Sequence, residues 1–436
     1  MILNYVVPIA LQQAVTSVNF ILDNIIVSQI GSVAIAALGS SNRFLFIIRF
    51  SIVAFSIGNA VISAQLSKSS KKGEIGKTLT VSVVTSVLFS IFFIVTYFTN
   101  RSFILTSFSP DEDIVSAAGS YIDIVIFSSF TLSIYLSLIT SLRSLGSLFY
   151  PMLSSALSLL VNFSLSYILV FGNWGFKSYG LRGAAYSTVI SEIVALLFLI
   201  VAAYMKQREM FSKEAFRPNL GDFRSYLRIS LIILFSHAVW SMQTMIMHNL
   251  FGKLGKSELV AYGAIIPIET IILDIFAAFG FSTLIFVGRK LALDKKKAAF
   301  SFSLNMLKVG TMVGAVAGLG LAILSSNIAS LYSVSYEEAA NIAILLRILG
   351  IFMAVKLSSS ILYNGILRAG GDMTFILLLT VLLAWGLIVP ISYIGYHFYN
   401  WNIYVIYTVM NASEVVTLTL MVLRFKSKKW MNNLVK

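Results

Sequence analysis

The 436-residue chain contains no cysteine, and only 11% of its residues are charged. The absence of cysteine excludes disulfide bonds and thiolate chemistry. A hydrophobic fraction of 58% and a mean hydropathy of +0.89 exclude an ordinary soluble domain. Runs of about 20 apolar residues are typical of transmembrane helices and lack the alternation of membrane-barrel strands. We therefore predict an all-α integral membrane protein.

The common signatures of catalysis are also missing. The sequence has no Gly-x-x-x-x-Gly-Lys-Ser/Thr loop for ATP, no His-Glu-x-x-His metal motif and no Gly-x-Ser-x-Gly nucleophile motif. We expect neither an enzyme nor an ATP-driven pump, and no organic cofactor.

Hydropathy divides the chain into twelve predicted spans, at residues 4–30, 34–66, 78–99, 114–141, 150–172, 182–205, 224–251, 258–287, 299–325, 337–366, 373–398 and 402–423. If both termini are cytoplasmic, most of the 32 Lys and Arg residues lie on the cytoplasmic side. The positive-inside rule then accounts for the net charge of +14. We expect a multi-pass protein of the cell membrane, whose environment is the lipid bilayer and which binds no nucleic acid.

The first predicted span carries a polar stripe that ends in an acid. Gln12, Thr16, Asn19 and Asp23 follow one another at helical spacing and share one face, while the other faces are apolar. A charge within a membrane helix costs roughly 2.5–3.5 kcal/mol on insertion scales. Such a residue normally faces a protein-lined or watery cavity, so Asp23 is the first candidate functional residue.

The chain contains an internal repeat with an offset of 225 residues. This offset places His237, Ser241, Thr244 and His248 on the seventh span at the spacing of the first stripe. It also carries residues 142–146 (Leu-Arg-Ser-Leu-Gly) onto residues 367–371 (Leu-Arg-Ala-Gly-Gly). We predict two six-helix lobes, residues 1–210 and 211–436, related by a pseudo-twofold axis along the membrane normal.

Further polar side chains line the fifth and sixth spans. Asn162 and Ser166 lie on one face of the fifth span, and Thr188 and Glu192 are neighbours on the sixth. Carboxylate, amide and hydroxyl oxygens suit a hard cation or a proton relay. We predict an ion or proton site at Asp23, Asn162 and Thr188, with Ser166 and Asn19 beside it. The alternative is a buried polar cluster that only holds helices together.

Other polar residues within the spans are candidates for lining the cavity or contacting substrate. They are Gln12, Thr16, Glu192, His237, Ser241, His248, Glu269, Asp274 and Arg49. Glu192 is expected either to line the cavity or to pair with a base such as Arg182. Arg49 and Asp274 are equivalent in the repeat to within one residue, and we hypothesise that they pair in one conformation.

The order of several short segments resembles the multidrug and toxic compound extrusion (MATE) transporters over nearly the whole chain. These segments are Asp23 with residues 29–31 (Gln-Ile-Gly) and 36–38 (Ala-Ala-Leu), residues 63–66 (Ser-Ala-Gln-Leu), 142–146, 162–172, 180–188, 367–372, Trp385 and Pro390.

The resemblance implies a twelve-helix protein with two lobes around a central cavity that exports amphipathic, often cationic organic compounds against Na⁺ or H⁺ entry. We expect a monomer that works by alternating access. Asp23 matches the coupling acid of the family, and Asn162 and Thr188 match its polar partners. Ser166 stands where prokaryotic relatives often have Asp, and Trp240 aligns near their seventh-span Glu, for which Glu269 or His248 are possible substitutes. A lipid-linked saccharide flippase of the same superfamily is the alternative, because Arg49, Arg347 and Lys356 would suit an anionic cargo.

Overall fold

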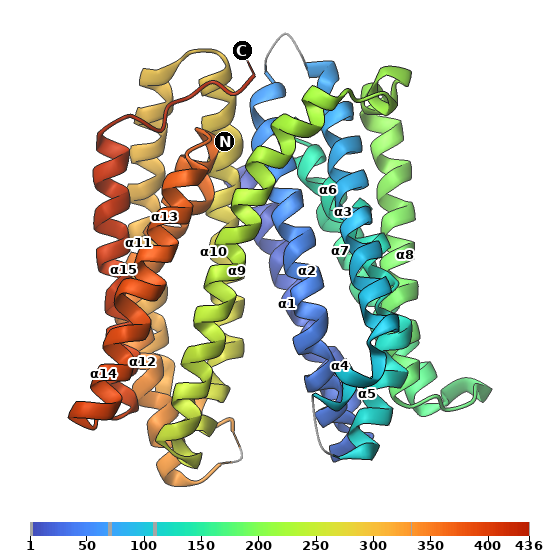
Figure 1. The fold of residues 1–436 in the computed structure, drawn as a ribbon, viewed down its shortest axis with the longest axis vertical. Helices are drawn as coiled ribbons and strands as arrows, with labels where there is room; N and C mark the ends of the chain where they lie inside the picture. The colour runs from blue at the N-terminus through green and yellow to red at the C-terminus, as the bar shows by residue number, and fades with distance from the viewer. Residues whose placement is uncertain (1–2, 69–71, 108–110, 333, 436) are drawn as a thin grey trace. The chain divides into compact units, whose positions relative to one another are not determined.

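The computed structural model describes residues 3–68, 72–107, 111–332 and 334–435, and these are almost entirely helical (Figure 1). The first half holds α1 (Leu3–Ser28), α2 (Ser32–Leu66), α3 (Ile75–Thr99), α4 (Arg101–Thr106), α5 (Glu112–Val125), α6 (Ser128–Leu145), α7 (Phe149–Phe171) and α8 (Leu181–Lys206). The second half holds α9 (Leu220–Leu254), α10 (Lys256–Ala292), α11 (Lys296–Ala329), α12 (Tyr336–Ser360), α13 (Met373–Leu383), α14 (Val389–Tyr399) and α15 (Ile403–Lys426). Two π-helical segments, η5 (Ile361–Leu367) and η6 (Ala384–Ile388), continue α12 and join α13 to α14.

The predicted all-α membrane fold is confirmed. Within the described ranges, eleven helices are long and apolar enough to cross a membrane, with α12–η5 and α13–η6–α14 each counted as one. The pair α5 and α6 passes the same test together, although the two helices meet at an angle of 47°. Counting this bent pair as one span gives the twelve spans that hydropathy predicts.

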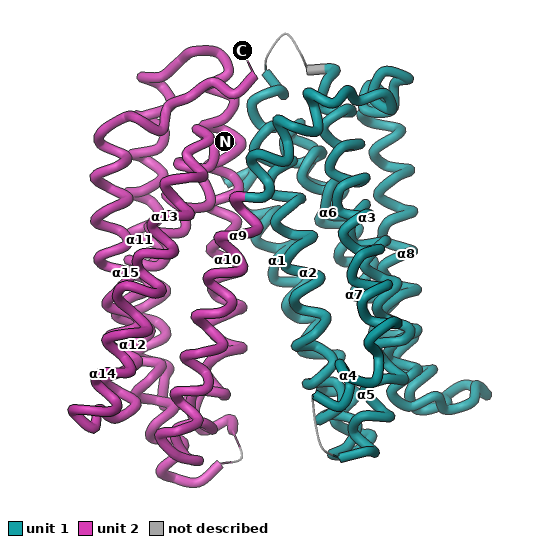
Figure 2. The backbone as a smooth tube through the Cα atoms, viewed as in Figure 1, with its two compact units in different colours: residues 1, 3–231 teal, residues 2, 232–436 magenta. Residues whose placement is uncertain are grey.

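The chain forms two compact units, residues 3–231 and residues 232–436 (Figure 2). The division lies inside α9, whereas the sequence places it between residues 210 and 211. The first turns of α9 belong to the first unit because the Tyr226 hydroxyl donates to the Phe55 carbonyl at 2.7 Å and to Ser82 Oγ at 3.0 Å. Gly58 allows this approach, since a Cβ atom there would lie 2.0 Å from Ser230 Oγ.

Small polar side chains hold the helices of unit 1 together. Asn59 on α2 is fully buried, and its Nδ2 lies 2.8 Å from the Ser137 carbonyl and 2.8 Å from Thr140 Oγ1 on α6. Ser63 Oγ donates to Asn59 Oδ1 at 2.9 Å. In a membrane the helices gain little from the hydrophobic effect, so such hydrogen bonds and close packing supply much of their association.

In unit 2 the corresponding close packing is made by glycine. Helices α11 and α12 approach so closely that a Cβ atom on Gly318 would lie 2.1 Å from the Gly350 carbonyl oxygen. A Cβ atom on Gly314, one turn earlier, would lie 2.8 Å from Ala354 Cα. Three of the four glycines of α11, Gly310, Gly314 and Gly318, therefore form a small-residue face, which lets two membrane helices gain contact along their backbones.

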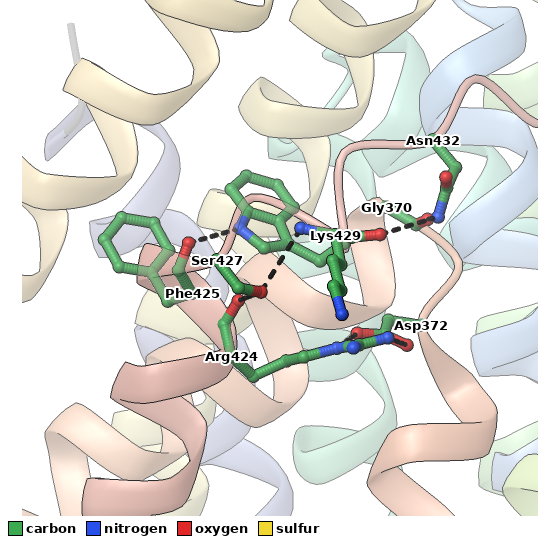
Figure 3. Close-up of polar contacts among 8 residues, drawn as sticks. Gly370, Asp372, Arg424, Phe425, Ser427, Lys429 and Asn432 are labelled. Carbon is green, nitrogen blue, oxygen red and sulfur yellow. Dashed lines mark hydrogen bonds and ion pairs between the residues drawn. The ribbon is translucent and has the colours of Figure 1, made fainter.

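The chain following α15 is packed onto the connection between η5 and α13 (Figure 3). Arg424 makes a two-pronged ion pair with Asp372, at 2.6 and 2.9 Å. The Trp430 ring is fully buried and its Nε1 donates to the Phe425 carbonyl, while Asn432 Nδ2 donates to the Gly370 carbonyl at 3.1 Å. The segment after α15 thus packs against residues 367–371, the second copy of the repeated Leu-Arg motif.

Candidate functional site

The predicted ion site in unit 1 is built from four helices. Asp23 on α1 lies beside Asn162 on α7, and it also interacts electrostatically with Arg49 on α2 and Glu192 on α8. The Asn162 side chain is fully buried and that of Asp23 partly buried. Helix α1 packs against α7 and α2, and this packing brings the polar stripe of α1 toward these residues.

Several polar atoms of this cluster lack a hydrogen-bond partner within the described part of the chain. They are Asp23 Oδ1, Asn19 Oδ1, Glu192 Oε2 and both Nδ2 and Oδ1 of Asn162, and all are buried. Buried polar groups are normally satisfied, and the requirement is stricter in a membrane, where no bulk water is available. A carboxylate oxygen and two amide oxygens left open together provide acceptors for a small cation, or for a proton with a water molecule.

Arg49 is engaged by another acid. Its Nη2 lies 3.4 Å from Glu192 Oε1, so Glu192 pairs with Arg49 and not with Arg182, the base named from sequence. The Arg49 side chain keeps 41% of its exposure, and Glu192 keeps 19%. Arg49 and Glu192 balance each other, which leaves Asp23 as the further acid of this cluster.

Two predicted site hydroxyls point to other partners. Ser166 Oγ and Ser187 Oγ are 2.6 Å apart, which joins α7 to α8. Thr188 Oγ1 donates to the Ala184 carbonyl of its own helix at 3.0 Å. These bonds make Ser166 and Thr188 part of the wall of the site, and neither hydroxyl is among the open acceptors beside Asp23.

Tyr121 on α5 belongs to the same cluster, although the sequence reading missed it. Its side chain is buried, interacts with Thr188, and experiences the charges of Asp23, Arg49 and Glu192. A tyrosine in an apolar span carries little signal by itself. Its relevance depends on the packing of α5 against α2 and α8.

The first two residues of the polar stripe on α1, Gln12 and Thr16, make other contacts. The buried Gln12 accepts a hydrogen bond from Arg143 Nη2 at 2.6 Å and donates to Ser155 Oγ at 3.0 Å. Thr16 is exposed, and its hydroxyl donates to the Gln12 carbonyl. Gln12 therefore fastens α1 to the end of α6 and the start of α7.

The second unit repeats this contact at the predicted offset. Arg368 Nη2 lies 3.4 Å from His237 Nε2, and these two residues are the repeat equivalents of Arg143 and Gln12. Arg368 is buried and stacks on the Tyr363 ring, 4.5 Å from the ring centroid. Each unit thus ties the first helix of its repeat to the arginine that ends its fourth span.

The remaining candidates of unit 2 lie along α9 and α10. Ser241 is partly buried on α9, and His248 is exposed with its ring 5.9 Å from that of Tyr262. Asp274 is partly buried on α10. Glu269, on the same helix, pairs with Lys356 of α12 at 2.9 Å. The predicted pairing of Arg49 with Asp274 stays a prediction.

A cavity of about 520 Å³ lies elsewhere in unit 1, against α4, α5 and the start of α8. Its wall includes Arg101, Asp123 and Arg182, and Arg101 holds Asp123 through two contacts at 3.0 and 2.8 Å. The hydrogen bond to Asp123 raises the pKa of Arg101, which keeps this base charged. The lining residues do not include the Asp23 cluster.

The family model described as MatE matches residues 8–168 and again residues 233–394. The two matches begin 225 residues apart, the offset of the internal repeat. The chain is 24% identical over 412 residues to "Uncharacterized transporter YisQ" of Bacillus subtilis, covering 94% of this chain and 90% of the relative. It is 22% identical over 401 residues to "Probable multidrug resistance protein NorM" of Thermotoga maritima, covering 91% and 85%.

Solved structures show the same fold. "Crystal structure of MATE in complex with MaL6" matches with a TM-score of 0.88 at 17% identity, over 98% of this chain and 96% of that one. A Pyrococcus furiosus transporter, titled "Reverse polarity of binding pocket suggests different function of a MOP superfamily transporter", matches equally well, also at 17% identity over 98% and 96%. With two family matches at the repeat spacing and relatives along nearly its full length, this chain belongs to the MATE family of multi-pass membrane transporters.

Proposed function

We propose that this transporter exports amphipathic, cationic organic compounds in exchange for the entry of Na⁺ or H⁺. The observation that carries the proposal is the buried Asp23 Oδ1, which has no hydrogen-bond partner in the described residues and whose carboxylate lies beside the Asn162 amide. A coupling cation and a cationic substrate compete for negative charge, and each would favour a different orientation of the transporter. Exchange requires such differential binding to two states.

The cation and the proton use the same acceptors. Asp23 would bind either ion through its carboxylate, and Asn162 and Asn19 would add amide oxygens for a metal cation. Thr188, Ser166 and Tyr121 would shape the wall behind them. Glu192 balances Arg49 and so keeps the added positive charge of Arg49 from cancelling Asp23.

The paired bases argue against the flippase alternative. Arg49 is opposed by Glu192 and Lys356 by Glu269, while Arg347 donates to Ser325 Oγ and Ser326 Oγ at 3.0 and 2.9 Å. An anionic pyrophosphate cargo needs bases that are available to it. Two of the three bases that favoured a flippase, Arg49 and Lys356, are paired with acids, while Arg347 bonds, within the described residues, only to neutral hydroxyls. The two ion pairs support the exporter.

The setting of this function follows from the charge distribution. We place the protein in the cell membrane as a monomer with both termini in the cytoplasm, where the basic loops would also lie. Alternating exposure of the Asp23 site to the two sides would carry out the exchange, without ATP hydrolysis or other catalysis.

The decisive experiment measures dye efflux in inverted or reconstituted vesicles under separately imposed Na⁺ and proton gradients. We expect one of the two gradients to drive transport of a cationic dye. The matched control variant is Asn24→Ala, because Asn24 adjoins Asp23 but its Nδ2 donates to the Phe20 carbonyl of its own helix. Asp23→Asn should lose the response and Asn24→Ala should keep it. Failure of both gradients to drive any dye or labelled organic cation would contradict the proposal.

A further inference from the structure

Unit 2 contains a buried acid that already has a cation of its own. Lys356 Nζ on α12 lies 2.9 Å from Glu269 Oε1 on α10. The two side chains are only 11% and 15% exposed. Both lie well inside helices that are long and apolar enough to cross the membrane.

The surroundings of Glu269 complete its coordination. The Tyr407 hydroxyl of α15 donates to Glu269 Oε2 at 3.3 Å, so both carboxylate oxygens have a partner. Glu414, also on α15, interacts electrostatically with Lys356. Tyr262 is the further titratable group that interacts with Glu269, and the His248 ring adjoins Tyr262.

This arrangement differs from that of Asp23 in unit 1. Asp23 Oδ1 has no hydrogen-bond partner in the described residues, and the base beside it, Arg49, is matched by Glu192. Glu269 has an ammonium group at contact distance. Glu269 therefore already has a cation bonded to it within its own unit, whereas Asp23 Oδ1 has no hydrogen-bonded cation among the described residues.

A bound ammonium group on the chain differs from a free cation in one respect. A free ion binds and leaves with its concentration, whereas the Lys356 ammonium is always present at a high effective concentration because it is covalently attached. An opposite charge within about 4–6 Å also favours the charged form of a carboxyl group. A proton or Na⁺ from solution would have to displace this ammonium and leave it unpaired in an apolar region, which is costly.

We infer that Lys356 is a tethered cation that permanently occupies the Glu269 site, so that the coupling ion binds at Asp23 alone. Lys356 then sets the ion stoichiometry of transport, at one coupling ion per cycle. This inference rests on the proposed exchange function for its consequence in transport. The state of Glu269 itself can be measured without transport.

The first test therefore uses chemical labelling of the purified, detergent-solubilised protein. Dicyclohexylcarbodiimide modifies protonated carboxyl groups in apolar surroundings, and peptide mass spectrometry identifies the labelled residue. We expect Glu269 to remain unlabelled in the wild type at neutral pH, and to be labelled in Lys356→Gln, because an unpaired buried carboxyl group is held in its neutral form. Labelling of Asp23 in both proteins shows that the reagent reaches the membrane-spanning region.

The matched control is Lys356→Arg, which keeps the tethered charge and should leave Glu269 unlabelled. Labelling of Glu269 in the wild type to the extent seen for Asp23 would overturn the inference, and this result needs no variant to fold. Equal, absent labelling in wild type and in folded Lys356→Gln would overturn it as well.

The second test measures transport in proteoliposomes at a clamped membrane potential. Lys356→Gln should move one additional cation per substrate, so the accumulation reached with a tenfold ion gradient should rise by about tenfold. The double variant Glu269→Gln/Lys356→Gln should return to the wild-type ratio. An unchanged ratio in Lys356→Gln would refute the stoichiometric role. If the wild type shows no ion-driven transport, the exchange function fails while the labelling result still decides the state of Glu269.

Discussion

Replacing Asp23 with Asn removes the charge of the proposed coupling site while keeping nearly the same side-chain volume. One carboxylate that binds one monovalent cation gives an exchange of one cation for one monovalent substrate, which moves no net charge. A tenfold ion gradient then supplies about 1.4 kcal/mol and sustains at most about tenfold accumulation of substrate. In Asp23→Asn the neutral amide would not bind the coupling cation, so the ion gradient would no longer drive the substrate and the accumulation ratio should fall to about one.

Proteoliposomes that contain the protein and a labelled tetraphenylphosphonium ion provide the assay for this accumulation ratio. The Na⁺ and proton gradients are imposed separately at a clamped membrane potential, and thermal stability confirms that the variant is folded. Asn24→Ala serves as the matched control and should retain the wild-type ratio. A well-folded Asp23→Asn that still sustains about tenfold accumulation would refute the coupling role of Asp23. A wild-type ratio far above tenfold would refute the single coupling ion.

Three further variants test the packing around the sites. Gly318→Leu should lower the melting temperature in detergent, because a side chain there meets the backbone of α12 and overpacking costs about 1–3 kcal/mol or more, whereas an unchanged melting temperature would contradict the close helix approach. Gln12→Leu removes the hydrogen-bond acceptor of the buried Arg143, so denaturation measurements should show a loss of about 1–3 kcal/mol in the free energy of unfolding. Gln12→His, which copies His237 of the second repeat, should retain most of the stability. Trp430→Ala removes a fully buried ring and should lower the free energy of unfolding by about 3–5 kcal/mol. Limited proteolysis should then cut the chain after α15 faster than in the wild type. An unaltered cleavage rate would show that Trp430 does not hold this segment against unit 2.

The two arginines that end the fourth span of each repeat make corresponding contacts, but with different partners. Arg143 binds an amide in unit 1, and Arg368 approaches an imidazole in unit 2. The repeat is therefore preserved as geometry while its chemistry has diverged. The same divergence separates the open acid of unit 1 from the lysine-bound acid of unit 2.

Local patterns along the chain were enough to predict the class of fold. Hydropathy counts spans, and because lipid forces every backbone group to be satisfied within its own helix, each long apolar run becomes helical, although the fourth run bends between α5 and α6. The offset of 225 residues predicted the repeat, which the two family-model matches confirm. Helical spacing also placed the stripe from Gln12 to Asp23 on one face, since that depends only on the pitch of a single helix.

The partners of those residues were decided by the tertiary structure. Sequence offered Arg182 for Glu192 and named no partner for Lys356, whereas the structure brings Arg49 and Glu269 to them from other helices. A shift of one turn moves a side chain by about 5.4 Å along its helix, which exceeds the reach of an ion pair. Which charges meet therefore depends on the rotation and depth of neighbouring helices, and these are set by close contacts such as that of Gly318 with Gly350. The sequence determined that Asp23 lies on a polar face, and only the packing of four helices left its Oδ1 without a hydrogen-bond partner in the described residues.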